Sequence, residues 1–221
     1  MNKNLRLRLA ALFMGVMTLT TFAACSDDDD KDVLPEKPEQ PEKVLEVKTI
    51  TLPNLGYGED NWIYFSFEKG EVLEGINESN RAEDTSWDLA FYRYNIRTNS
   101  GLSGKGKGGV VDTEKTELVE VAEAPAGEYT TDVMGEITAN MSSFPPPTIE
   151  SPLSEVLGNA LQFQGPPPTY TPNNHVYVVK TANGKYAKIK ILGFYNDEGK
   201  SGHVSFEYAY QADGTTNLNT K

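Results

Sequence analysis

The chain has 221 residues and a formal net charge of −12, from 32 acidic and 20 basic side chains. This acidity argues against nucleic acid or anionic lipid headgroups as partners, because both are recognised by clustered basic side chains. A single cysteine among 221 residues leaves no disulfide to hold a fold together, so one hydrophobic core must do so.

The first 24 residues have the pattern of a secretory signal. Three basic side chains lie among the first eight residues, an apolar run follows, and Ala23 and Ala24 precede Cys25. A cysteine at the first mature position is typical of bacterial lipoproteins, whose acyl chains anchor the protein in a membrane. We therefore predict a signal peptide over 1–24 and lipidation of Cys25; a thiol buried in a core is the alternative.

An acidic and proline-containing segment follows the cysteine. Residues 27–30 are four aspartates, and residues 31–43 contain Pro35, Pro38 and Pro41 among charged side chains. The aspartates resemble the export signal of surface lipoproteins in the Bacteroidetes group, although a generic solvated linker has the same composition. The prolines predict an extended, semi-rigid spacer. We predict a tether over 25–43 and a lipid-anchored protein on the outer membrane, exposed at the cell surface.

Beyond residue 43 the hydrophobic period is two, which predicts strands. The Asn183-Gly184 pair predicts a tight hairpin, and residues 196–199 predict the next turn. Residues 150–158 alone suggest a short helix. We predict an antiparallel all-β domain over 44–212 and a frayed polar tail over 213–221. The expected strands are 44–52, 62–70, 86–98, 108–113, 116–124, 129–137, 175–181, 186–195 and 203–211.

Two segments interrupt the strand pattern. Residues 143–148 and 164–172 each contain three consecutive prolines, which are stiff and cannot donate to a β ladder. Because they flank the predicted helix, they are either the two lips of a cleft or inert connections.

Motifs for nucleotide binding and hydrolysis are incomplete. Residues 101–107 have the G-x-x-x-x-G-K spacing of a phosphate-binding loop, but Gly108 replaces the hydroxyl residue and a predicted strand follows. We interpret this stretch as a tight connection between strands. His175 and His203 stand at predicted strand starts, without a nucleophile elbow or zinc-ligand spacing. We expect a protein that is not an enzyme; an unrecognised hydrolase is a further hypothesis.

One long block is similar to a known family. NWIYFSFEKGEV and SWDLAFYRYNIRTNSGLSGKGKGGVV, followed in order by YTTDVMGEIT, LSEVLG and PPPTY, resemble the HmuY family of surface haem-binding lipoproteins. The resemblance implies an antiparallel, right-hand-shaped β fold with one or two short helices. It also implies iron acquisition: capture of haem outside the cell and transfer to a TonB-dependent outer-membrane receptor.

The resemblance also implies where haem would bind. In the family two loops hold the iron from both sides, through histidines in one member and methionines in some relatives. The first loop is 141–152 here, where the only sulfur is that of Met141, and the second is 161–170, where Gln164 stands near the ligand position. Neither loop has a histidine, and Met134 is expected to be buried in a strand. The implied site residues are Met141 as iron ligand, with Phe144, Phe163, Gln164 and Tyr170 around the macrocycle.

Three interpretations of this altered site stay open. Haem is held by Met141 alone between apolar side chains, or another porphyrin or apolar ligand occupies the cleft. Alternatively, the cleft has lost haem ligation and binds a glycan or a protein partner.

Overall fold

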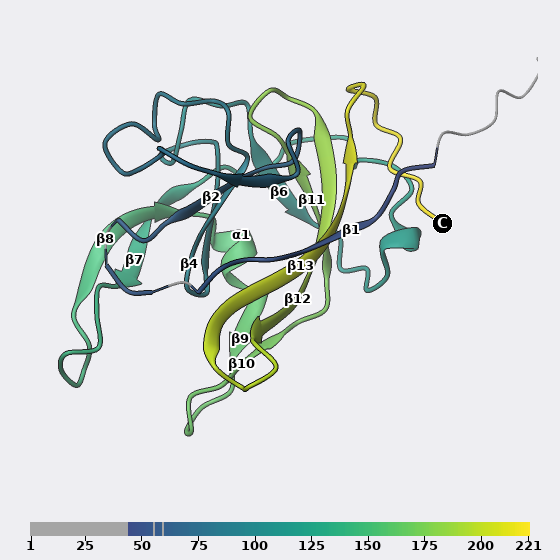
Figure 1. Cartoon of the computed structure of the whole chain (residues 1–221). Coiled ribbons are helices and arrows are strands. Elements are labelled where there is room, and N and C mark those ends of the chain that lie inside the picture. Colours follow the sequence, from purple (N-terminus) through teal and green to yellow (C-terminus); the bar gives the residue numbers. More distant parts are fainter. Residues whose placement is uncertain (1–43, 55, 59) are drawn as a thin grey trace, which may run out of the picture. The chain divides into compact units, whose positions relative to one another are not determined.

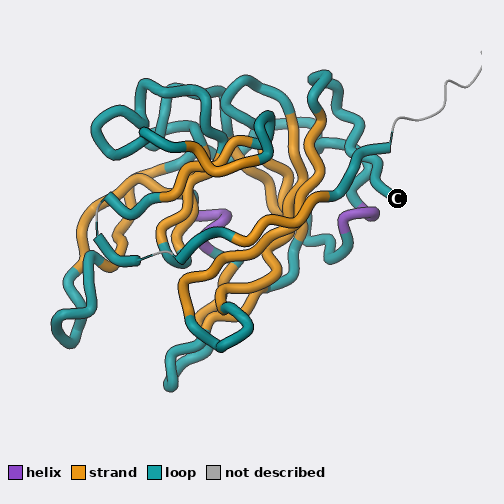
Figure 2. Tube along the Cα trace, in the orientation of Figure 1, coloured by secondary structure: helices purple, strands orange, loops and turns teal. Residues whose placement is uncertain are grey.

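The computed structural model describes residues 44–221 except Leu55 and Glu59 (Figure 1). The predicted signal peptide, Cys25 and the tether over 25–43 lie outside the described residues. In the described part of the chain, no helix is long and apolar enough to cross a membrane. The predicted all-β class is confirmed: antiparallel sheets dominate, with a single short α-helix and one 3₁₀ turn among the described residues (Figure 2).

The larger sheet has five antiparallel strands in the order β1-β13-β12-β11-β6 (Figure 1). Its three C-terminal strands form the predicted meander. The turn between β11 and β12 uses Gly184 at a φ of 84°, a conformation that favours glycine. The strand bounds are β1 Lys48–Thr51, β6 Gly109–Asp112, β11 Val176–Lys180, β12 Tyr186–Tyr195 and β13 Ser201–Gln211.

The second sheet has four strands in the order β3-β2-β4-β5. The predicted strand over 86–98 is divided into β4 and β5, because Arg93 has a φ of 56° and reverses the chain. All four β4 residues are buried, since both faces of this sheet are covered. The bounds are β2 Ile63–Ser66, β3 Glu71–Leu73, β4 Leu89–Tyr92 and β5 Asn95–Thr98.

The main core lies between these two sheets. Val204, Phe206 and Tyr208 of β13 face it, as their alternation predicts, and meet Phe65 and Phe91 of the smaller sheet. Edge-to-face and stacked ring pairs, such as Phe91 on Phe206 at 5.4 Å between centroids, fill this layer.

Two hairpins form separate two-stranded sheets beside this core, to which one of them contributes Leu161. Their strands are β7 Val133–Thr138 with β8 Thr148–Leu153, and β9 Leu161–Phe163 with β10 Tyr170–Pro172. Helix α1, Glu155–Gly158, lies between them in sequence and is capped by the Ser154 hydroxyl, which accepts from the Leu157 amide. The helix predicted over 150–158 is therefore half as long as expected, because residues up to 153 complete β8.

The predicted strand over 116–124 is wrong. These residues contain a 3₁₀ turn, η1 Leu118–Glu120, which buries Leu118; Val121 and Ala124 are buried in the segment that follows the turn. They cover the outer face of the larger sheet together with Leu45 and Leu218.

The expectation of a frayed tail over 213–221 is also wrong. Leu218 is fully buried, and its amide donates to the Ala122 carbonyl at 2.7 Å. The Leu45 amide donates to the Asn219 carbonyl, so the start and the end of the domain are joined. Beneath them the fully buried Lys188 ammonium donates to two carbonyls and to the Thr220 hydroxyl. The tail is a structural part of the domain.

The glycine-rich stretch is a tight strand connection, as interpreted from its sequence. The Asn99 carboxamide accepts from the Gly106 amide and donates to the Asp84 and Trp87 carbonyls. A Cβ atom on Gly108 would lie 2.6 Å from the Asn99 carbonyl oxygen. The chain continues directly into β6, so no helix N-terminus faces this loop.

Candidate functional site

The residues expected to bind a ligand lie on the two isolated hairpins. Met141 and Phe144 lie in the β7–β8 tip, residues 139–147, and are 62% and 98% exposed. Phe163, 57% exposed, ends β9, and Gln164 begins the β9–β10 tip, residues 164–169. Tyr170 begins β10. The structure thus places the five residues on two separate hairpins, two on one and three on the other (Figure 1).

The β9–β10 hairpin stands on a cluster of rings. The Tyr170 ring stacks on Tyr94 at 4.4 Å and 15°, and meets Phe194 at 5.3 Å and Phe163 at 5.5 Å. Its amide donates to the Tyr195 hydroxyl at 2.8 Å. Burial and the nearby Tyr94 hydroxyl raise the pKa of Tyr170, so its phenol stays neutral at pH 7. The cluster of rings at the foot of the β9–β10 hairpin is therefore rigid and apolar.

Tyr94 also contacts the other hairpin. Its hydroxyl lies 3.2 Å from the Thr138 hydroxyl at the end of β7, and the Tyr92 hydroxyl donates to the Thr138 carbonyl at 2.7 Å. The two hairpins therefore rise from one shared aromatic base.

A cavity of about 450 Å³ opens beside the β9–β10 hairpin. Three rings and three carboxamides contribute to its wall: Tyr94, Phe163, Tyr170, Asn95, Asn159 and Gln162. Its lining has no charged side chain. Such a surface suits a flat or ring-shaped ligand with an apolar face.

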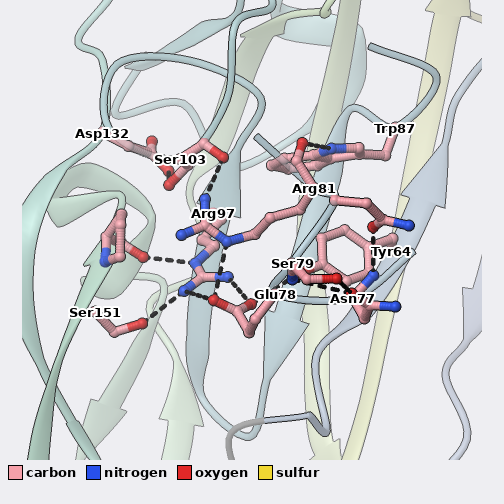
Figure 3. Close-up of polar contacts among 12 residues, drawn as sticks. Tyr64, Asn77, Glu78, Ser79, Arg81, Trp87, Arg97, Ser103, Asp132 and Ser151 are labelled. Atoms are coloured by element: carbon pink, nitrogen blue, oxygen red, sulfur yellow. Dashed lines mark hydrogen bonds and ion pairs between the residues drawn. The ribbon is translucent and has the colours of Figure 1, made fainter. Parts of the chain in front are cut away.

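The β7–β8 hairpin is rooted in a buried polar network (Figure 3). The guanidinium of Arg97, fully buried on β5, donates to the Pro152 carbonyl and the Ser151 hydroxyl of β8, both at 2.6 Å. It also pairs with Glu78 and covers the Trp62 ring at 3.6 Å. Burial alone would raise the pKa of Glu78, but its bonds with Arg97 and Arg81 lower it overall.

Asp132, the residue before β7, forms the other half of this root. Its carboxylate is 2% exposed and accepts from the Thr98 amide, the Thr98 hydroxyl and the Ser103 hydroxyl. Burial raises its pKa to about 6, despite these hydrogen bonds. The hairpin that carries Met141 is thus held at its root by polar groups, while Ile137 alone of its side chains joins the fully buried core.

Other expected positions differ or lie elsewhere. Met134 is 50% exposed on β7, so the expectation of a buried residue there is wrong; β7 has only one covered face. The His175 Nδ1 atom lies 2.9 Å from an Asp112 oxygen, and His203 lies within β13. Over the described residues, no group of three or more His, Cys, Asp or Glu side chains is arranged to hold a metal ion.

Sequence reasoning did not identify Tyr94, Arg97 or Asp132. Tyr94 and Arg97 lie inside the most specific part of the family block, which was the only signal near them. Their contacts with the β7–β8 hairpin are long-range, 44 positions apart for Tyr94 with Thr138 and 55 for Arg97 with Pro152.

Comparison with known proteins gives a consistent result. A model of the HmuY protein family matches residues 58–208. A search of curated proteins gave no match.

Solved structures agree with this match, each with a TM-score of 0.60. A Bacteroides vulgatus protein assigned as HmuY-like and heme-binding is 29% identical in sequence, and the match covers 73% of this chain and 90% of the Bacteroides vulgatus chain. The apo HmuY analog (TFO) of Tannerella forsythia is 26% identical, over 77% and 99%. Apo PinO of Porphyromonas gingivitis is also 26% identical, over 75% and 97%.

Proposed function

The chain belongs to the HmuY family, and we propose on this basis that it binds haem or a related tetrapyrrole outside the cell. We further propose that it is a lipid-anchored surface protein without catalytic activity, which passes its ligand to a TonB-dependent outer-membrane receptor. The observation that carries the proposal is the pair of hairpins with exposed apolar tips on one aromatic base.

The tips suit a flat apolar macrocycle. Phe144 is 98% exposed and Phe163 is 57% exposed, although large rings gain most free energy when they are covered. Three consecutive prolines in each tip stiffen the surface that they present. Ordering such tips around a ligand therefore costs less conformational entropy than ordering flexible loops.

The iron ligands are restricted by the residues present. Met141 offers a thioether from one tip, whereas the Gln164 carboxamide of the other already donates to the Thr171 hydroxyl. Thioether sulfur is a soft ligand and favours ferrous over ferric iron. We infer that Met141 is the axial ligand and that apolar contacts supply much of the affinity.

Titration of the purified protein with haemin, in air and after reduction with dithionite, tests this proposal. We expect a Soret shift, and we expect Met141→Ala to weaken binding of the reduced form at least about tenfold, as removal of a metal-supporting group commonly does. Met134→Ala is the matched control, because that methionine is half-exposed on the same hairpin but lies in the strand. His175→Ala and His203→Ala are expected to have little effect.

Two outcomes contradict these assignments. A protein without a Soret shift in either iron state does not bind haem. Equal losses in Met141→Ala and Met134→Ala would remove Met141 as the ligand.

The anchor and the transfer step need separate tests. Cys25→Ser is expected to release the protein from the membrane fraction, because a single thiol carries the lipid. If the protein lies at the surface, protease added to intact cells should digest it. Loss of bound haem to membranes that contain the receptor, and not to membranes that lack it, would support transfer.

A second function is favoured by the cavity beside β9–β10. Rings and carboxamides without charge suit a neutral sugar, which stacks one face on a ring and hydrogen-bonds to amides. If haemin fails to bind while a panel of neutral oligosaccharides contains a ligand, Asn159→Ala and Gln162→Ala should weaken its binding. Unaltered binding in both variants would exclude this cavity.

A further inference from the structure

The distance between the two tips depends on contacts at the bases of the hairpins. Each hairpin is a sheet of only two strands and belongs to neither larger sheet, although Thr130 and Ser154, beside the β7–β8 hairpin, hydrogen-bond through their backbones to Val110 and Ile96. Such ribbons have little stability of their own and take their direction from what they pack against. Tyr94 makes a side-chain contact with both of them.

We propose that Tyr94 is the positioning residue that fixes the spacing between the two hairpins, and with it the width of the ligand gap. The proposal rests on the proposed function in one respect: the gap is taken to be the tetrapyrrole site. The spacing itself is a property of the protein without ligand.

The ring and the hydroxyl of Tyr94 make different contacts, although the hydroxyl also lies near the Tyr170 hydroxyl. Its ring stacks on Tyr170 at the start of β10, and its hydroxyl meets the Thr138 hydroxyl at the end of β7. Thr138 is three residues from Met141, so the hydroxyl contact lies close to the β7–β8 tip. A single substitution can therefore remove one contact and leave the other.

The backbone holds Tyr94 in place for this role. Arg93 turns the chain between β4 and β5 at a φ of 56°, and its guanidinium lies over the Tyr57 and Phe194 rings at 4.6 and 5.2 Å. The Phe194 ring also meets Tyr94 at 6.2 Å. With its neighbour and its own ring both packed, Tyr94 is a fixed point from which both hairpins are held.

Three variants separate the contacts. Tyr94→Phe removes the hydroxyl and keeps the stack, Thr138→Val removes the same contact from the other side with little change of shape, and Tyr94→Leu removes both contacts. Tyr129→Phe is the matched control, since that hydroxyl donates to the Pro125 carbonyl in the cluster under η1.

Distances between the tips report the spacing directly. Spin labels at Ser142→Cys and Thr169→Cys, both exposed, are placed in the full chain with Cys25→Ser, and distances are measured without ligand. We expect a broader distribution for Tyr94→Phe and Thr138→Val than for the parent and Tyr129→Phe, and no further broadening when the two are combined. Unchanged distributions in Tyr94→Phe and Tyr94→Leu would overturn the proposal.

Measuring the haemin affinity of the same variants tests whether the distance between the tips affects ligand binding. Loss of one hydrogen bond that holds the gap is expected to weaken haemin binding about fivefold in Tyr94→Phe. An affinity equal to that of the parent, despite a broadened distance, would overturn the link. If the parent does not bind haemin, the proposed function fails, and the spin-label distances alone still decide the role of Tyr94.

Discussion

Asp132→Asn tests whether a buried carboxylate limits the stability of the β7–β8 root. The two oxygens of Asp132 accept three hydrogen bonds, from the Thr98 amide and hydroxyl and from the Ser103 hydroxyl. An asparagine keeps the shape and one acceptor. The NH₂ group of the asparagine can take the place of the carboxylate oxygen that faces the Thr98 hydroxyl. The Thr98 hydroxyl would then accept from this NH₂ group and donate to the Ser100 hydroxyl oxygen, which lies 2.7 Å away.

The direction in which the free energy of unfolding changes with pH follows from the pKa of Asp132. Burial raises it to about 6, from an ordinary value of 3.8, so the folded protein holds this proton more tightly than the unfolded chain. The resulting stability is fully present below about pH 4 and is lost as the pH rises through 6. The difference between the two pKa values corresponds to about 3 kcal/mol in the free energy of unfolding.

Urea denaturation at several values between pH 4 and 7 measures this effect. The free energy of unfolding of the parent, minus that of Asp132→Asn, is expected to fall by about 3 kcal/mol over this range. Taking the difference cancels the other titrating groups, including Glu78, whose lowered pKa acts in the opposite direction. Asp197→Asn, in the exposed turn after β12, is the control for an acid-to-amide change.

A difference that stays constant with pH, or that rises, would refute this reasoning. It would mean that the three hydrogen bonds outweigh burial and leave the carboxylate as easily ionised in the folded protein as in the unfolded chain.

Substitutions at Lys188, Gly108 and Gly158 test two further features of the fold. Burial of Lys188 lowers its pKa to about 8 from 10.5, so we expect the free energy of unfolding of the parent, minus that of Lys188→Met, to rise by about 3 kcal/mol between pH 8 and 10.5 in urea denaturation. Taking the difference cancels the buried tyrosines, whose raised pKa values act in the opposite direction over this range. Gly108→Ala places a Cβ atom against the Asn99 carbonyl oxygen and should lower the free energy of unfolding by about 1–3 kcal/mol. The Cβ atom of Gly158→Ala, in α1, meets open space, so this variant should be neutral or stabilising by up to about 1 kcal/mol. Equal melting temperatures for the two alanine variants would contradict the packing of the glycine-rich stretch on Asn99.

Much of the sheet could be predicted because alternation is a local signal. The burial of Val204, Phe206 and Tyr208 on one face follows from their spacing, and the turn at Gly184 follows from the Asn-Gly pair. The strand predicted over residues 116–124 was wrong for a physical reason. A run with apolar residues at 119 and 121 looks like a strand, whereas burial of every third residue is visible only when the sheet beneath it is known.

The polar root of the β7–β8 hairpin was not predictable from the sequence. Arg97 and Asp132 are charged residues in mixed stretches, and charged side chains are seldom fully buried without a partner. Their partners, Glu78, Ser151 and Ser103, lie 19 or more residues away. The same limit applies to Lys188, whose three acceptors come from η1, the residue after it and the C-terminal segment.

The division between base and tip explains how the family fold can persist while the residues at the tips change. The free energy that holds the hairpins comes from their bases: the rings under β9–β10 and the polar root of β7–β8. Met141 and Phe144 lie beyond these bases and are mostly exposed, so substitutions at the tips change little buried surface. Ligand chemistry can therefore change at the tips while the base stays constant. It follows that Phe144→Ser should leave the melting temperature unchanged, even if it weakens ligand binding.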